Sequence, residues 1–302
     1  GDLDPRLASA IVSACDELLI GQLQEEFVVD VIQGGAGTST NMSANEVIAN
    51  RALEHLGFDR GRYDLLSPKD HVNKCQSTND VYATAIRLTI VLLNEGLMDA
   101  VQKCADAFSH KADEFADVRK LGRTQLQDAV PMTLGQEFAA FAASLSEDIS
   151  RIREMRPLFL ETNMGGSAIG TSAGVSDYYR DHIVTQLAEV SGLPVTLAAD
   201  RIEATSDTGM FVFYSGLLKR LATKLSKIAN DLRLLSSGPV GGFGELKLPQ
   251  QQPGSSIMPG KVNPVIPEMV NQVCYRIFGA DTTVPFAAES GQLQLKAMEP
   301  VN

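Results

Sequence analysis

The sequence has no tryptophan, only four histidines and four cysteines, and aromatic residues make up 6% of its 302 residues. The histidines are scattered, so no pair has the spacing of a metal site, and we expect no metal and structural or solvated imidazoles. The cysteines show neither zinc-ribbon nor redox spacing, and nothing reads as a secretory signal. We therefore expect reduced thiols in a cytoplasmic protein. The residues concerned are His55, His71, His110, His182, Cys15, Cys75, Cys104 and Cys274.

Positive charge is also scarce, because the net charge is -11 and the isoelectric point is near 4.9. Phosphate-rich partners need a clustered cationic surface, so we expect neither nucleic acid nor an anionic membrane as a partner. A small anionic substrate remains possible, since a few cations can dominate within a cleft. The longest apolar run, Leu88 to Leu93, is interrupted by Thr89 and is far shorter than a membrane span.

Apolar residues recur at steps of three and four in the stretches 86–108, 134–155 and 218–235, which predicts three long helices. No proline lies between Asp80 and Lys120, whereas Pro157 is expected to end the second stretch. The third stretch alternates these steps without a fault, as in the seam of a supercoiled bundle.

Two further helices are predicted at 44–56 and 264–278, and no stretch alternates long enough to predict a sheet. The predicted fold class is therefore all-α, a bundle of long helices. Residues 86–93 are apolar almost all round the helix, which favours burial by neighbouring subunits in an oligomer.

Polar, glycine-rich segments connect the predicted helices, and binding residues concentrate in such loops. They comprise 34–45, 73–80, 122–127, 165–177 and 236–263. Neutral hydroxyl and amide groups gather in them beside a single lysine, Lys261, which suits a substrate that bears carboxylates. The alternative is that they are ordinary caps and turns, with Ser77 to Asp80 only the N-cap of the following helix.

The segment from Gly254 to Pro264 superficially resembles a phosphate-binding loop but departs from it twice. Five residues separate Gly254 from Gly260, and Val262 replaces the hydroxyl residue that would ligate magnesium. We therefore expect no nucleotide and no other cofactor.

The same eleven residues, GSSIMPGKVNP, closely resemble the signature of the aspartase/fumarase superfamily. The segments 37–42, 76–80 and 122–128 resemble the other loops of that family in the same order. The resemblance covers essentially the whole chain. It implies an all-α bundle that forms homotetramers with sites shared between subunits. It also implies that residues 1–80 are the remainder of an N-terminal domain, that 81–302 form the central bundle domain, and that a small C-terminal domain is absent.

Within the superfamily, the loops resemble the aspartase branch more than class II fumarases, because Gln125 stands where fumarases carry a histidine. This implies elimination of ammonia from L-aspartate to give fumarate. The alternatives are a class II fumarate hydratase, or an inactive helical oligomerisation core if the chain is truncated.

By the same resemblance, Ser255 is the base that removes the proton from C3, giving an aci-carboxylate intermediate. Lys261 and Asn263 face the substrate carboxylate, and Thr124 and Gln125 lie on the leaving-group side. The remaining residues that the resemblance assigns to substrate binding are Thr38, Asn41, Ser77, Thr78, Asn79 and Glu268. Val240 and the segment 171–174 depart from the family pattern.

Overall fold

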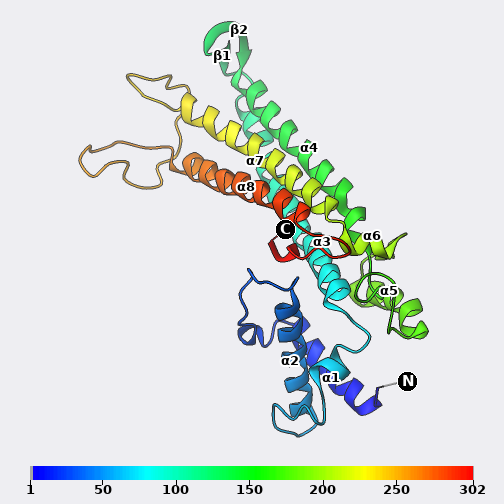
Figure 1. The fold of residues 1–302 in the computed structure, drawn as a ribbon. Helices are drawn as coiled ribbons and strands as arrows, with labels where there is room; N and C mark the ends of the chain where they lie inside the picture. Colours follow the sequence, from blue (N-terminus) through cyan, green and yellow to red (C-terminus); the bar gives the residue numbers. More distant parts are fainter. Residues whose placement is uncertain (1–2, 302) are drawn as a thin grey trace. The chain divides into compact units, whose positions relative to one another are not determined.

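The computed structural model describes residues 3–301 and divides them into two compact units. Unit 1 contains the residues up to 91, residues 157–210 and those from 284 onward, and unit 2 contains 92–156 and 211–283. Figure 1 shows the elements of both units. The division into domains at residue 80 that the family resemblance implies stays a prediction.

Long helices dominate the chain, in agreement with the predicted all-α class (Figure 1). They are α3 (Thr78–Glu114), α4 (Leu134–Leu160), α7 (Gly209–Leu235) and α8 (Val265–Glu289). In unit 2, α3, α4 and α7 share one hydrophobic core. Helix α8 joins the bundle through Asn271, whose amide donates to Ser226 Oγ of α7 at 2.9 Å.

The core of unit 2 follows the predicted apolar stripes of α4 and α7, whereas Leu93 of the predicted α3 stripe is 69% exposed. Every position of the α4 stripe is at most 6% exposed, namely Leu134, Phe138, Phe141, Leu145, Ile149, Ile152 and Met155. On α7, Leu221, Ile228 and Leu235 are buried, while Leu225 and Leu232 pack against the same core. Phe108 of α3 contacts Phe138 and Phe141 with ring centroids 5.8 and 5.6 Å apart.

The predicted helix ends were less accurate. Pro157 does not end α4, which continues to Leu160, because Phe159 and Leu160 are buried and offset the hydrogen bond that proline removes. The helix predicted at 44–56 is α2 (Thr38–His55), and the one predicted at 264–278 extends to Glu289 as α8.

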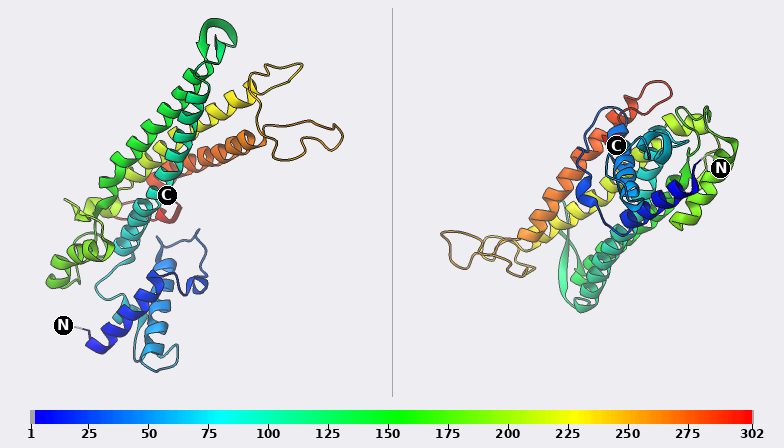
Figure 2. Two further views of the ribbon diagram at one scale, coloured as in Figure 1. Left: turned by 180° about the vertical axis from the view of Figure 1, so that it is seen from behind. Right: turned by 90° about the horizontal axis from the view of Figure 1, so that it is seen from below.

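The sequence analysis missed a β-hairpin, which follows α3 in the region expected to be helix and loop. Strand β1 (Arg119–Thr124) pairs antiparallel with β2 (Gln127–Thr133). Neither strand alternates apolar and polar residues, and β2 contains Pro131. The apolar side chains of Leu121 and Val130 are exposed, so the hairpin has no buried face that a pattern could mark. Figures 1 and 2 show the hairpin at the same end of unit 2 as the long connection between α7 and α8.

Unit 1 contains a small helical core between α1 (Pro5–Leu19) and α2 that the apolar patterns did not predict. Its buried residues are alanines and leucines, and the alanines Ala10, Ala14, Ala49 and Ala52 let the two helices approach closely. The remaining elements are short or belong to unit 1: η1 (Gln24–Glu26), η2 (Pro68–Val72), β3 (Glu161–Thr162), α5 (Asp177–Ser191), β4 (Thr196–Leu197), α6 (Arg201–Ser206) and η3 (Glu299–Val301).

Helix α3 is long and apolar enough to cross a membrane by length and composition, with a mean hydropathy of 1.3 over 18 residues. The uninterrupted apolar runs of the sequence are too short to reveal this property. A core helix of a bundle passes the same test, and α3 has polar partners along its length: Arg87 donates to the carbonyl of Glu161, and Asn94 accepts from the Tyr214 hydroxyl. These contacts are typical of a bundle helix.

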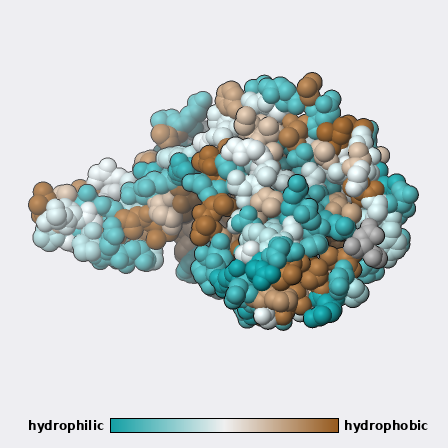
Figure 3. All heavy atoms as spheres, turned by 60° about the horizontal axis from the view of Figure 1, so that its bottom comes forward, coloured by the Kyte–Doolittle hydropathy of each residue, from teal (hydrophilic) through white to brown (hydrophobic). Residues whose placement is uncertain are grey.

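Apolar side chains also reach the surface of the single chain. Leu92 and Leu93 are 61% and 69% exposed, and on α8 Val273 and Phe286 are 51% and 67% exposed. Figure 3 shows hydrophobic patches between hydrophilic ones on the face it presents.

Candidate active site

Unit 1 gathers asparagine and hydroxyl side chains where the start of α3 meets α2. The Asn41 amide donates to Thr78 Oγ1 at 3.0 Å and to Asn73 Oδ1 at 3.2 Å. Asn45, one turn further along α2 and 5% exposed, donates to Asn41 Oδ1 at 3.2 Å and to Asn73 Oδ1 at 3.1 Å. Asn45 and Asn73 were not among the predicted residues, yet they determine the orientation of Asn41.

Ser77 and Asp80 cap the N-terminus of α3 reciprocally. Ser77 Oγ accepts from the Asn79 backbone N–H at 3.2 Å, and the Ser77 N–H donates to Asp80 Oδ1 at 2.9 Å. This is the capping-box pattern, with aspartate in the third helical position. The N-cap alternative considered for this segment is therefore correct, and it is compatible with a binding role because the cap orients Thr78 and Asn79.

Thr38 stands apart from these contacts. It is the first residue of α2, is exposed, and its hydroxyl donates to the carbonyl of Gly35 at 2.7 Å. The preceding Gly37 has a φ of +87°, and any Cβ there would collide with the Tyr82 ring. Glycine is therefore needed at this position for the chain to enter α2 beside α3.

Thr124 and Gln125 lie at the tip of the β1–β2 hairpin. Thr124 pairs with Gln127, so Gln125 and Leu126 are the two central turn residues, and both have positive φ, +55° and +65°. A two-residue turn in which both residues have positive φ favours Asn-Gly. Each larger residue in this left-handed conformation destabilises the turn by roughly 1 kcal/mol. Backbone strain of this kind tends to occur at functional positions.

One carboxylate anchors strand β1 of the hairpin to the connection that follows α7. Glu245 pairs with Arg123 at 2.5 Å and with Lys120 at 3.3 Å, and Lys120 also pairs with Glu137 at 2.6 Å. The Arg123 guanidinium lies over the Phe243 ring, 4.5 Å from its centroid. We call Lys120, Arg123, Phe243 and Glu245 the hairpin clasp.

A cavity of about 400 Å³ adjoins the hairpin clasp within unit 2. Its lining includes Thr124 and Gln125 from the hairpin and Lys227 and Asp231 from α7. Lys227 and Asp231 pair with each other, so they neutralise one another. The two predicted leaving-group residues therefore border an open volume rather than a packed core.

The signature segment forms a closed loop before α8. The Gly254 N–H donates to the Lys261 carbonyl at 3.0 Å, and the Asn263 amide donates to the Gly254 carbonyl at 2.7 Å. A Cβ on Gly254 would collide with that Lys261 carbonyl, so the closure requires glycine. Asn263 thus helps to hold the loop as well as being a predicted substrate ligand.

Ser255 is half-buried in this loop and its hydroxyl oxygen accepts two backbone N–H groups. The N–H of Ile257 lies 3.2 Å from Ser255 Oγ and that of Met258 lies 3.1 Å away. Serine turns often have such bonds. Two N–H dipoles aimed at one oxygen also stabilise negative charge on it, which lowers the cost of ionising the hydroxyl.

The side chains of Lys261 and Glu268 are the least constrained of the predicted set. Lys261 is exposed on the loop, and Glu268 is half-buried in the first turn of α8, where its backbone N–H donates to the Pro264 carbonyl at 3.1 Å. The ammonium group of Lys261 is therefore accessible to an anion.

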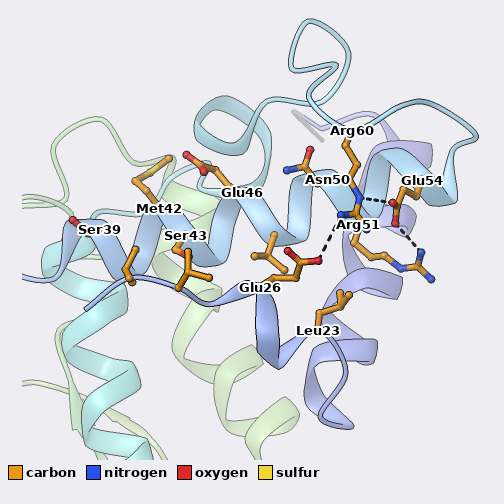
Figure 4. Close-up of a pocket in the computed structure, with 13 residues that line it drawn as sticks. Leu23, Glu26, Ser39, Met42, Ser43, Glu46, Asn50, Arg51, Glu54 and Arg60 are labelled. Atoms are coloured by element: carbon orange, nitrogen blue, oxygen red, sulfur yellow. Dashed lines mark hydrogen bonds and ion pairs between the residues drawn. The ribbon is translucent and has the colours of Figure 1, made fainter. Parts of the chain in front are cut away.

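A second cavity, of about 430 Å³, lies in unit 1 beside α2 (Figure 4) and includes none of the predicted site residues. Asn41 and Asn45 lie on one side of α2, whereas the cavity is lined from the other side, for example by Met42 and Glu46. Its two arginines already pair with Glu54, Arg60 at 2.5 Å and Arg51 at 2.8 Å. This cavity therefore lacks a free cation for a carboxylate.

The predicted residues thus fall into two groups. Asn41, Ser77, Thr78 and Asn79 come together in unit 1, with Thr38 nearby in sequence but outside their hydrogen bonds. In unit 2, Thr124 and Gln125 lie on the hairpin, and the signature loop holds the others, Ser255, Lys261 and Asn263, with Glu268 following on α8. Within residues 3–301, no group of three His, Cys, Asp or Glu side chains gathers as a metal site.

The hairpin clasp predicts a pH dependence of stability. Burial alone would raise the pKa of Glu245, but hydrogen bonds from Arg123 and Lys120 outweigh it and hold that pKa below its ordinary value. A lowered pKa in the folded state stabilises the protein above the ordinary glutamate pKa of about 4.3, and this stability is lost as the pH falls through the folded value. Glu245→Gln should therefore lower the Tm at pH 7 and have little effect near pH 3.

Calorimetry of both proteins across this pH range measures the difference. Glu154→Gln is the matched control, because the Arg151–Glu154 pair is more than half exposed and should contribute little. A Tm difference for Glu245→Gln that does not change with pH would contradict the ion-pair account of the clasp.

Comparison with known proteins identifies the family of this chain. The model of a family described as Lyase matches residues 2–279. The chain is 58% identical to a protein named aspartate ammonia-lyase from Pseudomonas canavaninivorans, over 100% of this chain and 64% of that protein. It is 56% identical to the aspartate ammonia-lyase of Escherichia coli K12, over 98% of this chain and 62% of that one. The chain thus spans less than two thirds of these relatives.

Solved structures agree with this relationship. A protein from Brucella melitensis described as "fumarate lyase:delta crystallin", bound to cobalt, matches 99% of this chain and 65% of its own with a TM-score of 0.97 and 60% identity. A class II fumarase from Schistosoma mansoni matches 100% of this chain and 66% of its own, with a TM-score of 0.92 and 35% identity. The chain therefore belongs to the Lyase family, within the aspartase/fumarase superfamily.

Proposed function

We propose that the protein containing this chain eliminates ammonia from L-aspartate to give fumarate. The observation that carries the proposal is the signature loop, in which two N–H groups face the Ser255 oxygen beside the accessible Lys261. Relatives named aspartate ammonia-lyase, which are 56–58% identical to this chain, support the choice of substrate. No cofactor is needed for this chemistry.

The main energetic task is the charge that develops on the substrate. Removal of a proton from C3, next to a carboxylate, places two negative charges on that carboxyl group as an aci-carboxylate. The site must stabilise this dianion more than it stabilises the substrate. Lys261 and the Asn263 amide supply a cation and a neutral donor for it.

Ser255 acts as the base, as an alkoxide. A free hydroxyl is far too weak an acid to ionise at neutral pH, so its charged form needs donors. The Ile257 and Met258 N–H groups are such donors.

The remaining residues bind and orient the substrate. The Asn41–Thr78 pair, with Ser77 and Asn79, forms a neutral set of donors and acceptors for the second carboxylate and the amino group. Thr38 is assigned to the same role, although its hydroxyl faces the Gly35 carbonyl in the free chain.

Thr124 and Gln125 face the leaving group. Hydroxide leaves poorly without a proton donor, whereas a protonated amine leaves as neutral ammonia, so glutamine in place of histidine suits deamination. With no histidine partner at position 125, Glu268 orients neighbours on α8 rather than relaying a proton.

Assembly into a homotetramer, with sites shared between subunits, completes the proposal. The two groups of residues lie in different units of the chain, and α3 and α8 expose leucine, valine and phenylalanine. Burial of these helices by neighbouring subunits would remove that apolar surface from water. We place the enzyme in the cytoplasm, where its thiols stay reduced.

The substrate assignment predicts that the full-length protein converts aspartate to fumarate and dehydrates malate at no more than a trace rate. The reason is the absence of a proton donor at Gln125. Absorbance of fumarate follows both reactions under the same conditions. Comparable kcat/KM values for aspartate and malate would favour the fumarate hydratase alternative, and no reaction with either substrate would contradict the proposed function.

The base assignment predicts that Ser255→Ala lowers kcat by at least about 100-fold and leaves dicarboxylate binding largely intact. Ser256→Ala is the matched control, because the neighbouring hydroxyl is exposed and has no assigned role. Steady-state kinetics, with succinate as a competitive inhibitor, separate turnover from binding. Near-normal turnover of Ser255→Ala would remove this residue from its role.

The shared-site assignment predicts recovery of activity in mixed tetramers. Thr124→Ala and Ser255→Ala proteins, each inactive, are unfolded together and reassembled. If Thr124 and Ser255 of one site belong to different chains, some mixed sites contain both wild-type residues, and activity rises well above either parent. A mixture no more active than its parents, despite demonstrated subunit exchange, would mean that each site is built within one chain.

A further inference from the structure

Asp80 is a fully buried carboxyl group, 0% exposed, that receives backbone N–H groups from two distant segments. From its own helix start, Ser77 donates to Oδ1 at 2.9 Å. From the segment after β3, the N–H of Ser167 donates to Oδ2, also at 2.9 Å. Burial raises the pKa of Asp80, while the N–H groups of Ser77, Ser167, Val81 and Gly165 oppose that rise.

No lysine, arginine or histidine among residues 3–301 forms an ion pair with Asp80. A buried carboxyl without a cation is costly unless it is hydrogen-bonded. The donors from the second segment depend on an unusual backbone, because Gly165 and Ser167 both have positive φ, +81° and +61°. Successive N–H groups in such conformations form a concave anion-binding site, which in this chain is occupied by the protein's own carboxyl group.

The same second segment also holds Asn79, the neighbour of Asp80. The Asn79 amide donates to the Ala168 carbonyl at 2.7 Å, and the Asn163 amide donates to the Asn79 carbonyl at 3.0 Å. Asn163 is 0% exposed and also donates to Thr205 Oγ1 at 2.8 Å. Three links therefore join residues 77–80 to residues 163–168.

We propose that Asp80 is a positioning residue for substrate binding, which locks the segment 163–168 against the Ser77–Asn79 ligands so that their donors are preorganised for a carboxylate. This proposal rests on the proposed function for the identity of the ligand. A capping role alone accounts for the Oδ1 bond to Ser77. It does not account for the Oδ2 bond to Ser167, which lies 87 positions away in the sequence.

The test is Asp80→Asn in the full-length protein, with succinate as the probe because it has two carboxylates and no leaving group. Asparagine has nearly the size of aspartate, but its side-chain NH₂ group must face the backbone N–H of either Ser77 or Ser167. That N–H loses its acceptor, so the segment that carries it is released. We expect calorimetry to give a succinate Kd at least about 10-fold higher, and kinetics to give a raised KM for aspartate with a smaller change in kcat.

Asp148→Asn is the matched control. Asp148 is also buried, at 2% exposed, but it pairs with Arg220 at 2.8 Å and Lys224 at 3.0 Å in unit 2. This control should lower the Tm without changing the succinate Kd. If Asp80 had a merely structural role, Asp80→Asn would also lower the Tm and leave the succinate Kd unchanged.

Gly165→Ala provides a second variant in case Asp80→Asn does not fold. Alanine is strained at the Gly165 φ of +81°, and its Cβ would approach Ile183 Cγ2 at 3.2 Å, so the turn that presents the N–H groups is disturbed while Asp80 is kept. We expect the succinate Kd of this variant to be higher than that of the wild type. Backbone amide hydrogen exchange in residues 163–168 should also be faster than in the wild type.

The outcomes separate the two proposals. Wild-type protein that binds no succinate and does not act on aspartate contradicts the proposed function. Wild-type protein that binds succinate, together with a folded Asp80→Asn or Gly165→Ala variant that binds it equally well, overturns the positioning role of Asp80.

Discussion

Burial of apolar stripes between long helices is the constraint on which the rest of the structure depends. The fully packed stripe of α4, from Leu134 to Met155, aligns α3 and α7 around one core. Polar loops are thereby carried to the ends of rigid elements. The hairpin and the signature loop lie at one end of unit 2 for this reason, and Glu245 of the hairpin clasp ties the hairpin to the connection that follows α7.

This acidic chain has few cations, and backbone N–H groups instead provide much of the stabilisation of negative charge. Two of them face the Ser255 oxygen, and two others donate to the Asp80 carboxyl from two segments of the chain. Such dipoles are fixed by the fold and need no reorganisation when charge develops, which is why they suit a reaction through a dianion. Lys261 then adds a cation where the substrate carboxylate is proposed to bind.

Much of the fold and of the candidate site could be predicted from the sequence, because helix periodicity and an eleven-residue signature are strong local signals. The core positions of α4 and α7 followed directly from the spacing of three and four. The hairpin did not, because its turn uses Gln125 and Leu126 instead of glycine or asparagine, and its strands lack alternation. Asn45, Asn73, Asp80 and Asn163 were also missed as site-supporting residues, since their partners lie 28 to 87 positions away and no local pattern marks such pairs.

We propose that the asparagine-rich group of unit 1 and the signature loop of unit 2 bind one dicarboxylate in the assembled protein. A crystal structure of the full-length protein with succinate tests this most directly. We expect one succinate molecule to be hydrogen-bonded to Lys261 and Asn263 of one subunit and to Thr78 and Asn79 of another, with Ser255 Oγ beside a methylene carbon. Succinate bound away from the signature loop, or held by only one of the two groups, would contradict the claim.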